Sequence, residues 1–179
     1  RGSSKRNQQL KVRLFDIKRA YCNALAAREH LYIEIPDELV PHRVNPSEVI
    51  GILRKSMYGT RDAGANWEAE FTSCLTEAGW KQGIACPNLY LHEELDAVAV
   101  CHGDDVHALG DEAALDMVQR AMEARYEVKV RANIGYGPRD SREATFLNRI
   151  VRLYEDRLEL EADPRHAREI VRSMGVEMA

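Results

Sequence analysis

The segment that most constrains the fold is Ala97–Gly110, AVAVCHGDDVHALG. An apolar run enters His102-Gly103-Asp104-Asp105 and an alternating run leaves it, which predicts hairpin strands at Ala97–His102 and Val106–Leu109 with an acidic pair at the tip. Adjacent strand side chains point to opposite faces, so two neighbouring Asp share one centre only at a turn or strand end. Carboxylates so close together repel unless a cation lies between them, although Gly-Asp pairs are also common in turns that bind nothing.

A second acidic strand end lies far upstream. Residues 10–17, LKVRLFDI, alternate apolar and basic side chains and place Asp16 in an apolar strand end. A buried Asp needs a cation or hydrogen-bond donors, and Arg19 alone could supply an ion pair. One Asp ending a strand, combined with an Asp pair on a later hairpin, is the carboxylate set with which palm-type polymerases hold two Mg²⁺ ions about 3.5–4 Å apart.

The rest of the pattern alternates strands with amphipathic helices. Helices are predicted at Asp62–Ala78, from Asp111 to about Tyr126, and from Asp163-Pro164 to about Met174. Further predictions are strands at residues 31–35, 49–53, 80–84, 89–92, 126–130, 145–153 and 157–160, a short helix or turn at 17–27, and loops at 36–46 and 131–142. This order favours an α+β, ferredoxin-like antiparallel sheet with helices packed on one face.

Composition predicts one globular domain. The chain has 179 residues, of which 45% are hydrophobic and 30% charged, enough for a sizeable core. Residues 1–9 are set aside as a tag-like or flexible lead, which leaves 10–179 as the domain. No apolar run is long enough to span a membrane, so no membrane partner is expected. Cys22, Cys74, Cys86 and Cys101 lack metal-site spacing and predict reduced packing residues of an intracellular protein, cytoplasmic or nuclear.

Charge neither supports nor excludes a nucleic-acid partner. The net charge of −4 argues against a strong general attraction to nucleic acid. Basic residues nevertheless cluster locally, at Lys5, Arg6, Lys11, Arg13, Lys18 and Arg19, and at Lys129, Arg131, Arg139, Arg142, Arg149 and Arg152. His102 and His107 flank the Asp pair, but their alternating strand positions predict that they face different ways, which argues against a His/Asp metal cluster.

An ordered series of motifs resembles the reverse transcriptases of Ty1/copia-type retrotransposons. The series is FDIKRAYCNA (Phe15–Ala24), LYIEIP (Leu31–Pro36), LRKSMYGTRDAGANW (Leu53–Trp67), PNLYLHEE (Pro87–Glu94), CHGDD (Cys101–Asp105) and FLNRIVRL (Phe146–Leu153). Each motif alone is weak, but together they keep the family's order and spacing from about Leu10 to the end of the chain.

The chain also departs from the family pattern. His102-Gly103 replaces the family's Tyr-x before the Asp pair, Gly64 stands for Pro and Asp62 for Gln. The sequence starts just before the first catalytic strand, so we expect a palm-centred fragment with partial fingers and thumb elements. The family's upstream fingers segment and its RNase H domain would then be partners from the rest of a retroelement polyprotein.

The resemblance implies a role for each matched residue. Asp16, Asp104 and Asp105 would be catalytic and, with the backbone carbonyl of Ile17, would bind two Mg²⁺ ions, or Mn²⁺. Tyr21 matches an aromatic gate that favours deoxynucleotides, although core packing would also explain it, and Tyr58 and Gly59 match the segment beside the incoming nucleotide. The resemblance assigns nucleic-acid contacts to Lys55, Arg61 and Arg149.

The sequence is therefore compatible with three functions. The first is an RNA-directed DNA polymerase that uses an RNA or DNA template-primer and deoxynucleoside triphosphates. The second is an inactive relic that keeps the palm fold as a nucleic-acid-binding, protein-binding or structural module. The third is an unrelated ferredoxin-like metal enzyme or nucleotide-cyclase-type enzyme, against which the ordered retroelement motifs argue.

Overall fold

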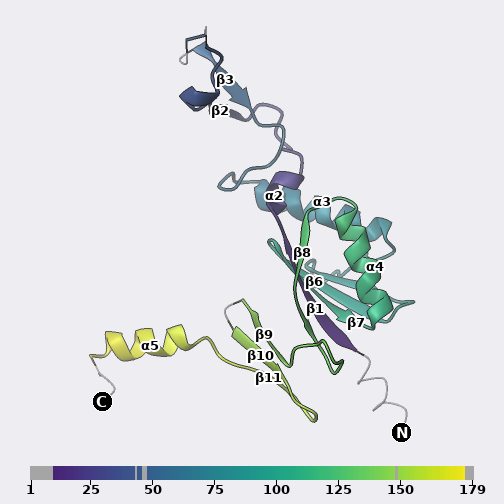
Figure 1. Ribbon diagram of the computed structural model, residues 1–179. Coiled ribbons are helices and arrows are strands. Elements are labelled where there is room, and N and C mark those ends of the chain that lie inside the picture. The colour runs from purple at the N-terminus through teal and green to yellow at the C-terminus, as the bar shows by residue number, and fades with distance from the viewer. Residues whose placement is uncertain (1–9, 43, 46–47, 148, 176–179) are drawn as a thin grey trace.

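The computed structural model describes residues 10–42, 44–45, 48–147 and 149–175 of an α+β protein (Figure 1). Its centre is a six-stranded sheet in the order β4-β5-β6-β7-β1-β8, in which all neighbours pair antiparallel. The strands are β1 (Lys11–Ile17), β4 (Lys81–Gln82), β5 (Leu89–His92), β6 (Ala97–His102), β7 (Asp105–Gly110) and β8 (Val128–Ile134). The predicted α+β class and the acidic hairpin β6–β7 are confirmed.

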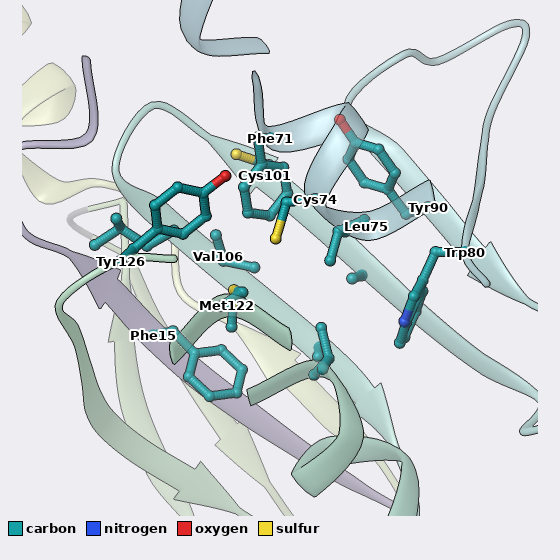
Figure 2. Packing of buried hydrophobic residues seen from close by; sticks show 14 of the residues in the cluster. Phe15, Phe71, Cys74, Leu75, Trp80, Tyr90, Cys101, Val106, Met122 and Tyr126 are labelled. Atoms are coloured by element: carbon teal, nitrogen blue, oxygen red, sulfur yellow. The ribbon is translucent and has the colours of Figure 1, made fainter. Parts of the chain in front are cut away.

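Two helices, α3 (Ala63–Glu77) and α4 (Glu112–Glu123), cover one face of this sheet, and the short helix α2 (Ala20–Asn23) packs against α3 at the end of β1. The side chains that recur at three- and four-residue steps on α3, among them Trp67 and Phe71, are buried as their spacing predicts. They pack against Phe15 of β1 and Val106 of β7, and against the inward face of α4 (Figure 2). Asp111 caps α4 as expected, its carboxylate accepting from the Ala114 amide at 2.9 Å.

The other face of the sheet carries the acidic residues. Because side chains alternate, burial of Val106 and Ala108 against the helices directs Asp105 and His107 to this open face. A small three-stranded sheet in the order β11-β10-β9 lies beside β8, and the Phe146 ring of β9 packs edge-on against His107 with centroids 4.3 Å apart. Its strands are β9 (Glu143–Phe146), β10 (Arg149–Leu153) and β11 (Leu158–Leu160).

Two further parts lie apart from the central sheet (Figure 1). The strands β2 (Tyr32–Glu34) and β3 (Ile50–Ile52) pair as a separate two-stranded unit beside the short 3-10 helix η1 (Asp37–Leu39). At the other end, α5 (Pro164–Ser173) begins where the Asp163 carboxylate accepts from the Arg165 amide at 2.9 Å. In the described part of the chain, no helix combines the length and the apolar character needed to cross a bilayer.

Some predicted boundaries are wrong. The strand predicted to end at Val130 continues to Ile134, into the predicted loop, because it pairs with β1 along its whole length. The strand predicted at Thr145–Leu153 is two strands, divided where Leu147 adopts a left-handed φ of 42°. The predicted lead, residues 1–9, lies outside the described residues.

Candidate functional site

The pairing of β1 with β7 brings two of the predicted carboxylates together. Asp16 and Asp105 are direct cross-strand partners, and both point to the open face because their neighbours Phe15 and Val106 are buried in the core. The Ile17 amide donates to the Asp104 carbonyl at 2.9 Å, which fixes the hairpin tip against the end of β1. Strands distant in sequence thus hold these carboxylates side by side.

A single cation bridges the two carboxylates, and it is Arg131 of β8. One guanidinium nitrogen, Nη2, contacts Asp16 Oδ1, and the other, Nη1, lies 3.5 Å from Asp105 Oδ1. Both carboxylate side chains are 24% exposed, so the pair is mostly shielded from water. Arg19, the other candidate partner of Asp16, is instead exposed, with a left-handed φ of 54°, ahead of α2.

A β-bulge delivers Arg131 to this position. Leu14 is paired with Ala132 and Phe15 with Val130, so Arg131 is the extra residue of β8 at that point. Val130 packs against the core cluster, and the extra residue faces the acidic pair. Bulges commonly re-aim one side chain in this way beside functional sites.

Asp104 occupies the turn between β6 and β7 and is more exposed than Asp105. Gly103 precedes it with a φ of +64°, a conformation that suits glycine. The buried Trp67 of α3 holds this tip, because its indole nitrogen donates to the Gly103 carbonyl at 2.6 Å. In the described part of the chain, no three His, Cys, Asp or Glu side chains converge as a ready metal centre.

Two of the predicted nucleotide-binding residues lie beside the tip. The rings of Tyr21 and Tyr58 have centroids 4.6 Å apart, and burial followed by the charge of Asp104 raises the pKa of Tyr58. Tyr21 also lines a cavity of about 200 Å³ between α3 and the hairpin, together with Gly64, Trp67, Glu68, Asn88, Tyr90, Cys101 and Gly103. Gly59 follows Tyr58 in a turn, with a φ of +90°.

The predicted nucleic-acid contacts are dispersed over the molecule. The Lys55 ammonium donates to the Asn23 carbonyl at 2.7 Å, so it ties its loop to α2. Arg61 is exposed just before α3. Arg149 lies on β10 of the small sheet, where its Nε donates to the Glu161 carbonyl at 3.1 Å.

The prediction that His102 and His107 face different ways is wrong. His102 pairs with Asp105 and His107 with Val100 across the hairpin, so both lie on the open face with the acidic residues. Alternation along one strand does not apply to this pair, because His102 lies on β6 and His107 on the paired strand β7. Burial lowers the pKa of His107, and the Nδ1 atom of this side chain is buried without a hydrogen-bond partner among the described residues.

The roles of two residues of the site do not follow from the sequence. Its pattern predicts Arg131 only as part of a basic cluster and Trp67 only as a core residue. A bulge has no clear signature in one sequence, and a core tryptophan does not reveal which carbonyl its N–H reaches. No protein-family model and no curated protein matches the chain.

Proposed function

We propose that this chain is the RNA-directed DNA polymerase domain of a copia-type retroelement. The supporting observation is that Asp16 and Asp105, from different strands, converge on one cation beside the hairpin tip that carries Asp104. The strand order β6-β7-β1-β8, with helices on one face, also fits the ferredoxin-like arrangement of a polymerase palm.

The residues fit hard divalent cations. Three carboxylates supply oxygen ligands of the kind that Mg²⁺ and Mn²⁺ prefer, and the guanidinium between two of them marks a point where a positive charge is accommodated. The proposal assigns the ions to Asp16, Asp104, Asp105 and the Ile17 carbonyl. When bound, such ions lower the pKa of a primer 3′-hydroxyl and neutralise a leaving pyrophosphate.

The remaining residues bind and orient the substrates in this proposal. Tyr21 and Tyr58 form an aromatic wall beside the tip, and a ring below the sugar would exclude a 2′-hydroxyl group. Gly59 leaves the backbone open to an approaching base. Lys55, Arg61 and Arg149 would contact phosphates of the template-primer, which position the duplex rather than specify its sequence.

The proposal includes partners from the same polyprotein. A fingers segment would grip the triphosphate of the incoming nucleotide, and an RNase H domain would remove the copied RNA. The proposed compartment is intracellular, cytoplasmic or nuclear, which agrees with cysteines that are all free.

Primer extension tests the proposal. We would measure incorporation of deoxynucleotides opposite an RNA template with Mg²⁺ or Mn²⁺, and compare the chain with Asp16→Asn, Asp104→Asn and Asp105→Asn. The matched control is Asp156→Asn, because Asp156 is 75% exposed on the hairpin that joins β10 and β11. Extension that is lost in the three site variants and retained in the control is the expected result.

One observation favours the second function, the inactive module. Arg131 already compensates part of the charge of the acidic pair, so the fold needs no metal ion to hold the two carboxylates side by side. Folded protein that gives no extension and binds neither Mg²⁺ nor Mn²⁺ would refute the polymerase proposal. Binding of an RNA–DNA duplex by the same protein would then support a binding module.

A further inference from the structure

We propose that Arg131 is a displaceable internal counter-ion, which competes with divalent cations for Asp16 and Asp105 and must leave before a metal ion binds. This role rests on the proposed metal site and would regulate the binding of metal ions to it. The metal-free protein would then be held in a closed state by one of its own side chains, which compensates part of the negative charge of the pair.

The geometry makes Arg131 specific for this role. The two guanidinium nitrogens contact one carboxylate each, so Arg131 spans the pair in the place where a shared ion would lie. The β-bulge in β8 supplies this side chain as an extra residue at that point. Lys129, the direct cross-strand partner of Asp16, is exposed and makes no ion pair with a described residue.

Charge makes the two states exclusive. Two carboxylates with one guanidinium carry a net charge of −1, and replacement of the guanidinium by a divalent ion brings the pair to neutrality. A guanidinium held against the same oxygens as the metal ion would repel it strongly in this shielded position. Binding of the ion therefore favours release of Arg131, and the reverse coupling has equal strength.

The structure also gives Arg131 a route out. Its side chain is 52% exposed, whereas the carboxylates that it bridges are 24% exposed. Arg131 lines an open cavity of about 690 Å³ between β8 and β9, whose other lining residues include Val130 and Glu143. The side chain can swing into this space without disturbing the sheet, because its flanking residue Val130 stays packed against the core.

The functional consequence is a higher threshold for metal binding. The apparent dissociation constant of the ion equals the intrinsic one divided by the fraction of molecules in which Arg131 is released. Ions at low concentration would leave the site closed. A ligand that brings metal together with phosphate would open it, because phosphate offers the released guanidinium a new partner.

The test is a titration with Mn²⁺ alone, followed by electron paramagnetic resonance of the free ion, without nucleic acid or nucleotide. Arg131→Gln should bind Mn²⁺ about tenfold more tightly than the parent, within the range typical of coupled sites. Arg131→Lys should be intermediate, because a single ammonium cannot bridge both carboxylates in a fork. Lys129→Gln removes the same charge from the same strand but no ion pair, and should change the affinity about twofold or less.

Other outcomes separate the two proposals. Equal Mn²⁺ affinity in Arg131→Gln and the parent, or weaker affinity in the variant, would refute the counter-ion role of Arg131. If Mn²⁺ binding is nevertheless lost in Asp16→Asn, the proposed metal site is still supported. Absence of Asp16-dependent binding in both proteins would overturn both proposals. Hydrogen exchange at the β1–β8 amides of each variant checks that the sheet is intact, so a loss of fold is not taken for a change in affinity.

Discussion

The hydrogen bond from Trp67 to the hairpin tip yields the sharpest prediction from the fold. Trp67→Phe keeps an aromatic ring in the core but removes the indole N–H that donates to the Gly103 carbonyl at 2.6 Å. Loss of the bond leaves the Gly103 carbonyl with only the weak thiol donor of Cys101 at 3.7 Å, and should cost about 1–2 kcal/mol. Incomplete filling of the indole space should add about 1 kcal/mol, so the free energy of unfolding should fall by about 2–3 kcal/mol.

The loss should also be local. The Ile17 amide donates to the Asp104 carbonyl, so its hydrogen exchange reports opening of the tip. A bond worth about 1 kcal/mol corresponds to a roughly fivefold faster exchange in Trp67→Phe, beyond the change that global destabilisation produces. The assay combines urea unfolding with native-state hydrogen exchange followed by nuclear magnetic resonance.

Phe71→Leu is the matched control. Phe71 is fully buried in the same cluster and packs against Trp67, with ring centroids 5.5 Å apart. Its replacement should cost about 1–2 kcal/mol and leave exchange at Ile17 unchanged relative to global stability. If both variants accelerate the Ile17 amide to the same relative extent, Trp67 does not hold the tip and the reasoning fails.

Two further predictions concern the buried polar and thiol groups of the fold. Arg13→Met should lower the free energy of unfolding by about 2–3 kcal/mol in urea titrations, because the buried guanidinium donates to Glu112, Asp116, Gln119 and Asn133. An unchanged midpoint would show that these partners rehydrate without cost. Burial raises the pKa of the Cys101 thiol to about 12, so at pH 8 the group is protonated and iodoacetamide should label exposed Cys86 while sparing Cys101 until the protein unfolds. Equal labelling of both in folded protein would contradict this burial.

The sequence predicted best those elements in which the spacing of apolar residues shows directly which face is buried. Alternation along residues 97–110 produced the hairpin, and the three- and four-residue spacing from Ala63 to Leu75 produced α3, because burial on one face imposes those periods directly. The convergence of Asp16 with the acidic hairpin followed once β1 was placed beside β7. That placement came from the order of the elements and from the family resemblance, not from a local signal.

The contacts that the sequence could not predict depend on the pairing register between strands that are distant in the chain. Whether Arg131 or Lys129 reaches Asp16 depends on a single extra residue in β8, and a shift of one position moves a side chain to the other face or to another partner. The predicted orientation of His107 was wrong for the same reason, because the face on which it lies depends on its pairing with Val100 across the hairpin.

The bulge also explains how the fold tolerates two carboxylates on neighbouring strands. Asp16 and Asp105 repel each other at cross-strand distance, and the sheet would lose stability at this position if no cation lay between them. Arg131 supplies that cation from β8, and because its side chain is exposed, another cation can take its place. A buried arginine such as Arg13, held by partners on two elements, could not act in this way. The difference in exposure between these two arginines is thus what separates a structural ion pair from a replaceable one.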